Sequence, residues 1–318
     1  MPSAGLIRFT PLFHERVWGG RRLADLFGKD LPPGAVVGES WELVDRPEAQ
    51  SVVAGGPLAG TTINELWAGA DRRRVFGGRS VAWGERFPLL VKLLDCTETL
   101  SVQVHPPAAI APELGGEPKT EMWVLLGDDP GAHVFAGLRA GATREGFGEA
   151  LRAGEDVSEQ LHRLPVTRGD VVFVPSGRVH AIGAGCVIAE IQQNSDTTYR
   201  VYDFDRPGLD GKPRELHVDE SIRSIDFDDV EPGLAEPAGE LLVGNDLFVV
   251  ERLVVDAPRP ASDAPGEMAV LCLLAGEATC AGEPLAAGEF VLVPAEASDA
   301  ELVPGGEPAE VLRIALPA

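Results

Sequence analysis

Short runs of alternating or β-branched apolar residues recur along this chain of 318 residues, and glycine, proline or aspartate separates one run from the next. Helical spacing of apolar residues is found in only a few places, chiefly residues 61–77, which begin with a threonine suited to capping, and residues 143–164. The clearest strand-like runs span residues 87–95, 100–106, 121–127, 171–176 and 186–193. This pattern predicts a mainly β fold of antiparallel strands with a few helical insertions.

Residues 228–240 differ in composition from the rest of the chain. They are acidic, lack aromatic side chains and are rich in proline, glycine and alanine, which is typical of a linker. We therefore expect two domains, one over residues 1–228 with an N-terminal extension and helical insertions, and one over residues 241–318.

A weak internal repeat relates residues 168–182 to residues 287–301. Each copy has a glycine, an acidic residue, an alternating apolar run and a proline. His180 of the first copy aligns with Asp299 of the second, so only the first copy keeps a histidine that could bind a metal. The repeat predicts a duplicated β-barrel whose second copy is degenerate and has no metal site.

The charge of the chain excludes several classes of partner. The sequence has 27 basic and 50 acidic side chains and a net charge of −23, so we expect no non-specific binding to nucleic acid or to an anionic membrane. No apolar run approaches the roughly 18 residues that span a bilayer, and residues 1–10 lack the features of a signal peptide. The four cysteines are far apart and read as reduced. We expect a cytoplasmic protein.

Four residues form a candidate metal site. Gln103 and His105 alternate with valines on one predicted strand, so their side chains point to the same face. Glu121 begins another predicted strand, and His180 follows a Pro-Ser-Gly turn. Two imidazoles and a carboxylate suit Zn²⁺, Fe²⁺ or Mn²⁺, and an amide oxygen could complete the set. The alternative is that the histidines are hydrogen-bonded core residues and the glutamate lies at a solvated strand edge.

Two motifs resemble those of the cupin superfamily. The spacing from Gly169 through Pro175 and Gly177 to His180 is similar to the second cupin metal motif, and Gln103-Val-His followed by a glutamate is similar to a variant of the first. Cupins often have an asparagine four residues past that second histidine, where this chain has Ala184. More narrowly, residues 5–225 resemble type I phosphomannose isomerase in its short bacterial form. The most specific matching strings are residues 88–95, 100–106, 118–126, 174–185 and 188–206.

This resemblance implies two cupin-type (jelly-roll) β-barrels, the first of them catalytic. It also implies a zinc-dependent aldose–ketose isomerase that interconverts mannose 6-phosphate and fructose 6-phosphate through an enediol or enediolate. One Zn²⁺ per chain would be bound by Gln103, His105, Glu121 and His180. The matching positions give Arg200 and Glu190 catalytic roles, and they place Ser101, Lys119 and Arg206 at the substrate.

The residues themselves leave alternatives open. Arg200 could form an ion pair with a nearby aspartate (Asp196, Asp203 or Asp205), and Glu190 could be a hydrogen-bonding group that lines the barrel. A non-catalytic sugar-phosphate-binding or sensing cupin and an iron-dependent cupin oxygenase are the competing functions, because cupins support many chemistries. The expected partner is a small sugar phosphate, with no nucleic acid and no membrane. The sequence leaves monomer and homodimer equally open.

Overall fold

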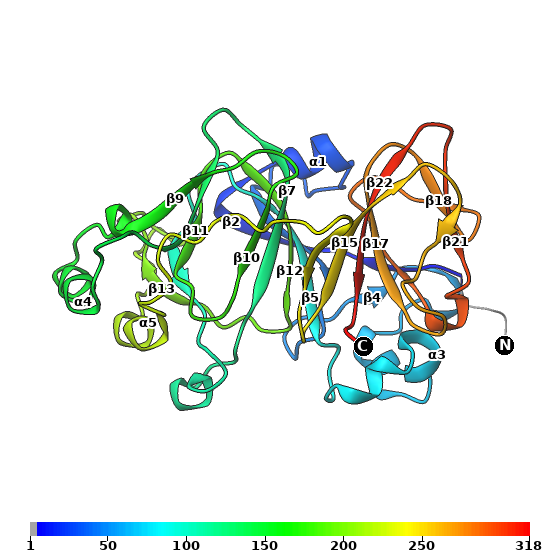
Figure 1. The fold of residues 1–318 in the computed structure, drawn as a ribbon, viewed down its shortest axis with the longest axis horizontal. Coiled ribbons are helices and arrows are strands. Elements are labelled where there is room, and N and C mark those ends of the chain that lie inside the picture. Colours follow the sequence, from blue (N-terminus) through cyan, green and yellow to red (C-terminus); the bar gives the residue numbers. More distant parts are fainter. Residues whose placement is uncertain (1–4) are drawn as a thin grey trace.

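The computed structural model describes residues 5–318, which form four antiparallel sheets arranged as two pairs. Figure 1 shows the C-terminal strands at one end of the molecule and two helices, α4 (Arg144–Ala153) and α5 (Val218–Ser224), at the other. The expectation of a mainly β fold with a few helical insertions is confirmed. No helix among residues 5–318 is long and apolar enough to span a membrane.

The first pair of sheets contains the predicted metal-site residues. From edge to edge, its larger sheet runs β10 (Val171–Val174), β7 (Glu121–Asp128), β12 (Cys186–Gln193), β5 (Leu89–Asp95), β3 (Val37–Leu43) and β2 (Leu12–Gly20). Its smaller sheet runs β13 (Tyr199–Tyr202), β6 (Val102–Val104), β11 (His180–Ile182), β8 (His133–Leu138) and β9 (Leu161–Pro165). Each strand-like run that the sequence singled out coincides with one of these strands to within a few residues at its ends, so those predictions are confirmed.

The second pair is built mostly from the C-terminal part of the chain. Its larger sheet runs β14 (Leu241–Gly244), β15 (Val249–Val255), β22 (Ala309–Ala315), β17 (Ala269–Ala275), β20 (Phe290–Val293), β1 (Ile7–Thr10) and β4 (Val52–Val53). Its smaller sheet runs β16 (Arg259–Pro260), β21 (Glu301–Pro304), β18 (Ala278–Cys280) and β19 (Glu283–Pro284). Two N-terminal strands therefore complete a C-terminal sheet, and the division of the chain at residue 228 stays a prediction.

Strand β12 shows how the two barrels pack together. Its residues are buried on both faces from Cys186 to Gln192. Ile188 packs with the apolar cluster inside the first barrel, whereas Ala189 and Ile191 belong to a cluster shared with the larger C-terminal sheet. Because side chains alternate along a strand, a strand between two layers must be apolar on one face and can present Glu190 to the barrel interior on the other. The interior of the second barrel is filled by apolar side chains, among them Leu253, Leu271, Val291, Leu302 and Val311.

The helices are shorter than the sequence patterns predicted. Over residues 61–77, helix α2 (Ile63–Ala68) begins at a Thr62 capping box, and a break at Gly69 separates it from α3 (Arg72–Phe76). Helix α4 begins at Thr143 but ends where Gly154 adopts a left-handed conformation. The expected helix over 143–164 is therefore wrong in its second half, where β9 forms. The remaining helical elements are α1 (Arg22–Phe27), η1 (Gly56–Leu58), η2 (Arg79–Ala82), η3 (Ala111–Leu114), η4 (Ser158–Gln160) and η5 (Ala295–Ala297).

The internal repeat corresponds to equivalent local structures. Gly169 and Gly288 both have positive φ angles, and in each copy a strand begins two residues later, at Val171 in β10 and at Phe290 in β20. The copies then diverge, because the first continues to β11 and His180 whereas the second forms the short helix η5. The predicted strand-and-turn likeness between the two copies is confirmed.

Candidate metal centre and substrate cavity

Three predicted metal ligands meet inside the first barrel. His105 follows directly after β6, Glu121 is the first residue of β7, and His180 is the first residue of β11. Their ligand atoms all lie within 4.8 Å of one another, and all three residues are buried. The Nε2 atoms of His105 and His180 lie 3.5 and 3.4 Å from the two carboxylate oxygens of Glu121. The two sheets thus bring together residues that are 75 positions apart in the chain at most (180 − 105).

Backbone carbonyl groups orient both imidazoles. The Nδ1 atom of His105 lies 2.9 Å from the carbonyl oxygen of Thr197, and that of His180 lies 2.9 Å from the carbonyl oxygen of Arg178. Because a carbonyl oxygen can only accept a hydrogen bond, each Nδ1 carries the proton and each Nε2 presents its lone pair to Glu121. This is the arrangement by which protein carbonyls fix metal-binding histidines.

The protonation states of these residues also suit a metal. Burial and the nearby Lys119 ammonium lower the pKa of His105 to about 3, and burial lowers the pKa of His180. Burial alone would raise the pKa of Glu121, but Lys119, whose Nζ lies 2.8 Å from its Oε2, holds that pKa well below its usual range. His105 Nε2 is buried without a hydrogen-bond partner. Two neutral imidazoles and a charged carboxylate are therefore ready to bind a divalent ion, and the donor set fits Zn²⁺.

Gln103 lies beside this group because of the register of the smaller sheet. It pairs with His180 on one side and with Arg200 on the other. Directly opposed residues of antiparallel strands share a face, so Arg200, Gln103 and His180 form a row across three strands. All three line a cavity of about 590 Å³. Whether Gln103 is a fourth metal ligand stays a prediction.

Three residues of the larger sheet, Lys92, Glu190 and Trp123, form a second row across the cavity. Glu190 pairs with Lys92 on one side and with Trp123 on the other, and all three line the cavity. Lys92 Nζ lies 3.1 Å from Glu190 Oε1 and 3.8 Å from Glu39 Oε2, and Trp123 Nε1 donates to Glu190 Oε2 at 3.2 Å. Glu39 also accepts hydrogen bonds from Arg16 and from the indole of Trp41 (both 2.7 Å).

Burial and the neighbouring charges shift the pKa values of Glu190 and Glu39. Burial raises the pKa of Glu190, although Lys92 opposes that shift. Burial would also raise the pKa of Glu39, but Lys92 and Arg16 hold it at about 2. The sequence analysis missed Lys92 and Glu39. The available signal was a single lysine inside the otherwise apolar stretch 87–94, which a buried strand tolerates only if a carboxylate neutralises it.

Arg200 stands at the opposite wall of the cavity. Its backbone N–H donates to His217 Nδ1 at 3.1 Å, and its Nη1 donates to the carbonyl oxygen of Glu215 at 2.8 Å. Burial and the nearby Arg214 lower the pKa of its guanidinium. Among residues 5–318 Arg200 forms no ion pair, so the alternative of a pair with Asp203 or its neighbours is wrong.

The remaining predicted residues divide into two groups. Ser101, Lys119 and Glu121 line the cavity with the residues already described. Arg206 is not among the lining residues; its guanidinium pairs with the buried Asp203 at 3.1 Å and with Glu98 at 3.5 Å. Arg214 also pairs with Asp203, at 2.5 Å, and does line the cavity. Nothing in the sequence pattern marked Arg214, because it lies in a loop without a recognisable motif.

The comparisons with known proteins agree with this geometry. The model of the type I phosphomannose isomerase catalytic domain matches residues 6–123. The mannose-6-phosphate isomerase of Streptococcus mutans is 42% identical over 246 residues, which cover 76% of this chain and 75% of the relative. The chain belongs to the type I phosphomannose isomerase family. The resemblance predicted from the sequence is confirmed.

Solved structures extend the likeness of this family member to the whole chain. The structure of mannose 6-phosphate isomerase from Bacillus subtilis is 31% identical, with a TM-score of 0.85, and the match covers 98% of this chain and all of that one. A mannose 6-phosphate isomerase bound with zinc and yttrium has a TM-score of 0.74 at 17% identity, over 99% of this chain and all of that one. The second match shows a shared fold. Both matches extend over the C-terminal barrel of this chain.

Proposed function

We propose that this protein is a zinc-dependent mannose-6-phosphate isomerase, which interconverts mannose 6-phosphate and fructose 6-phosphate. The observation that carries the proposal is the buried group of His105, Glu121 and His180 at a cavity of about 590 Å³. The similarity to mannose-6-phosphate isomerases supports the assignment of the reaction. The structurally similar isomerase bound with zinc and yttrium supports the assignment of zinc as the metal. The size of the cavity falls in the range that binds small molecules.

The metal would be held by His105, Glu121 and His180, with Gln103 as the fourth protein ligand. Zinc bound there would polarise the carbonyl and hydroxyl oxygens of the sugar and would stabilise the negative charge of an enediolate. Lys119 keeps Glu121 charged and so keeps it available as a ligand. The carbonyls of Thr197 and Arg178 hold the two rings in the required tautomer.

Glu190 is the residue we assign to proton transfer between C1 and C2 of the sugar. An aldose–ketose isomerisation needs one group that takes a proton from one carbon and returns it to the other. A buried carboxyl group with a raised pKa is suited to both steps near neutral pH. Lys92 contacts one carboxylate oxygen of Glu190 and Trp123 contacts the other, so the orientation of the Glu190 carboxyl group in the cavity is fixed.

Cationic groups would neutralise the substrate. Arg200 has no carboxylate partner among residues 5–318, and its planar guanidinium can bind two oxygen atoms of an enediolate or a phosphate. Ser101 and Lys119 line the same cavity and are proposed substrate contacts. Arg206 keeps its proposed role at the substrate only as a prediction, because Asp203 and Glu98 hold it in this structure.

A coupled assay tests the proposal. The purified protein is incubated with mannose 6-phosphate, and fructose 6-phosphate is measured before chelation, after chelation and after zinc is added back. We expect turnover that is lost with the metal and recovered with zinc. No turnover by the zinc-loaded protein would contradict the proposal, and binding of the sugar phosphate without turnover would favour a non-catalytic sensor. Recovery with iron but not with zinc would favour a different cupin chemistry.

A further inference from the structure

Arg46 lies outside the cavity, at a turn that the structure fixes firmly. The turn spans residues 45–50, directly after β3, and Asp45 within it is completely buried. The Asp45 carboxylate accepts hydrogen bonds from the backbone N–H of Phe87 (2.7 Å), from Asn64 (3.1 Å) and from Gln50 (2.9 Å). These hydrogen bonds fix the backbone at Asp45 and thereby the position from which the Arg46 side chain extends.

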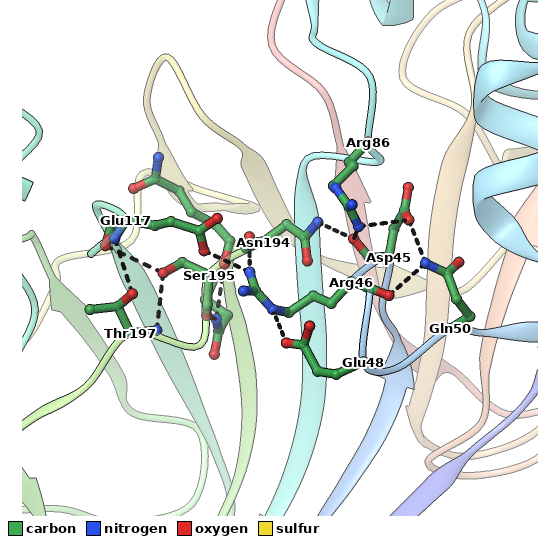
Figure 2. Close-up of polar contacts among 11 residues, drawn as sticks. Asp45, Arg46, Glu48, Gln50, Arg86, Glu117, Asn194, Ser195 and Thr197 are labelled. Atoms are coloured by element: carbon green, nitrogen blue, oxygen red, sulfur yellow. Dashed lines mark hydrogen bonds and ion pairs between the residues drawn. The ribbon is translucent and has the colours of Figure 1, made fainter. Parts of the chain in front are cut away.

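The Arg46 side chain joins this turn to two other loops, residues 115–120 and residues 194–198. Its Nη1 donates to Glu117 Oε2 at 2.7 Å and to the carbonyl oxygen of Asn194 at 2.9 Å, while its Nε pairs with Glu48 at 2.5 Å. Asn194 returns a hydrogen bond from its side chain to the carbonyl of Asp45 at 2.6 Å. Figure 2 shows Arg46 reaching across to the segment of Asn194, Ser195 and Thr197. The Arg46 side chain is 14% exposed.

The two loops held by Arg46 also hold each other. The backbone N–H of Glu117 donates to Thr197 Oγ1 at 3.0 Å, and Ser195 Oγ lies 3.4 Å from the carbonyl of Glu117. The Thr197 N–H donates to Ser195 Oγ at 3.2 Å. These contacts fix the Thr197 carbonyl, which is the acceptor that orients His105. Arg46 is thus connected to the imidazole by three hydrogen bonds through Glu117 and Thr197, or by two hydrogen bonds and the backbone from Asn194 to Thr197.

The same loops carry other groups that face the metal centre. Lys119 and Glu121 lie two and four residues after Glu117. Asp196 and Thr198 flank Thr197 and line the cavity. One cation therefore neutralises a carboxylate, satisfies a backbone carbonyl and ties together two segments that both lead to residues of the metal centre. No side chain in the network of Figure 2 other than Arg46 contacts both segments and the turn 45–50.

We propose that Arg46 is a positioning residue for the metal centre: it holds the loops 115–120 and 194–198 so that the Thr197 carbonyl orients His105 for metal binding. The inference rests on the proposed function, in that it takes His105, Glu121 and His180 as the metal ligands. Arg46 touches neither the metal nor the cavity, so it acts only through the loops. Loss of a group that is hydrogen-bonded directly to a metal ligand, as the Thr197 carbonyl is to His105, lowers metal affinity by roughly 10–100-fold in other proteins. Because Arg46 acts through that group, we expect an effect at the lower end of this range.

Zinc affinity is the first measurement that tests this role. The full-length protein competes with a chromophoric chelator for Zn²⁺, as the wild type and as the Arg46→Gln and Arg46→Lys variants. We expect Arg46→Gln to weaken zinc binding by about tenfold or more. Arg46→Lys keeps the charge near Glu117 and should regain a clear part of that affinity. Unchanged affinity in Arg46→Gln, or an affinity of Arg46→Lys no better than that of Arg46→Gln, would overturn the proposal.

Arg259→Gln is the matched control. Arg259 forms a two-pronged ion pair with Glu240 (2.6 and 2.8 Å) at the C-terminal barrel, away from the cavity residues. Its removal should leave zinc affinity within twofold of the wild type. An equal loss of zinc affinity in both variants would overturn the proposal, because the effect would then follow from lost stability alone.

A second measurement needs no metal and separates this inference from the proposed function. Amide hydrogen exchange over residues 194–198 is followed in the metal-free protein. We expect exchange there to speed up by at least tenfold in Arg46→Gln and to stay unchanged in Arg259→Gln. Equal exchange rates in Arg46→Gln and wild type would overturn the inference. An absence of isomerase activity in the zinc-loaded wild type would contradict the proposed function, but it would not change the outcome of the exchange measurement.

Discussion

Lys92→Met removes the buried cation that lies between two carboxylates in the first barrel. Lys92 is 5% exposed, and its ammonium lies 3.1 Å from Glu190 and 3.8 Å from Glu39. Methionine has a similar length and keeps most of the apolar stem, but it removes the ammonium group that lies 5.2 Å from the centroid of the Trp41 ring. The substitution therefore changes charge much more than volume, which makes its effect a direct measure of the electrostatic role of Lys92.

The distances set the size of the expected effect. Two unit charges 3.1 Å apart attract by about 5 kcal/mol at an effective dielectric constant of about 20. Removing one partner of a buried ion pair costs about 3–5 kcal/mol in practice. Glu39 keeps Arg16 and Trp41 as partners after the substitution, so the unpaired charge is chiefly that of Glu190. We therefore expect Lys92→Met to lower the free energy of unfolding by about 3 kcal/mol at neutral pH.

Urea unfolding of the metal-free protein measures this loss. Tryptophan fluorescence is a suitable signal, because Trp41 and Trp123 donate hydrogen bonds to the two carboxylates. The double variant Lys92→Met with Glu190→Gln removes the orphaned charge while an amide oxygen keeps the contact to Trp123. It should recover at least half of the loss. A matched Glu190→Gln single variant completes the double-mutant cycle.

The loss should also depend on pH. Burial raises the pKa of Glu190 above its ordinary value of 4.5, and without Lys92 that pKa rises further. An acid whose pKa is higher in the folded than in the unfolded protein binds more protons when folded, so stability falls as pH rises between the two values. The destabilisation by Lys92→Met should therefore be smaller at pH 5 than at pH 8. Equal losses at both pH values, or no recovery in the double variant, would refute the electrostatic reasoning.

Three further predictions concern the site. His180→Ala should lose zinc affinity by at least about 100-fold, together with activity, because one of the two imidazole ligands is gone; unchanged zinc content by elemental analysis would remove His180 from the ligand set. Arg200→Ala should keep its zinc but lower kcat/KM by on the order of 100-fold, since Arg200 contacts no predicted ligand through its guanidinium; wild-type turnover would leave Arg200 a structural role. Raising NaCl from 50 to 500 mM should raise KM for mannose 6-phosphate several-fold, because a few cations attract the phosphate; a KM independent of salt would contradict a cationic cavity.

Much of the fold could be predicted because the sequence patterns follow strand geometry. The alternation in residues 100–106 places Gln103 and His105 on one face whatever the rest of the chain does. Local pattern was less useful at residues 143–164, where apolar spacing continues past Gly154 although the helix ends there. A left-handed glycine terminates a helix regardless of the periodicity beyond it, so the glycine was the more informative residue.

The site was predictable where a motif carried it and not where sheet register did. His105, Glu121 and His180 could be found because the spacing of short motifs restricts them. The partnership of Lys92 with Glu190 depends on the register between β5 and β12, which no short pattern encodes. Arg46, Glu117 and Asn194 come from three loops that meet only in the folded chain. Their association could not be read from any one segment.

The position of β1 has a consequence for the order in which the chain can fold. One edge of β1 pairs with β4, but on its other edge Ile7 pairs with Leu292 and Arg8 forms ion pairs with Glu283 and Glu289, so that edge obtains its partner only from the C-terminal barrel. During synthesis, that edge of β1 stays unpaired until β20 has been made. A chain that stopped at the predicted linker would leave the apolar face of β12 and β1 uncovered. The second barrel, although it contains no predicted ligand, thus covers the back of the sheet that carries Glu190 and pairs the open edge of β1.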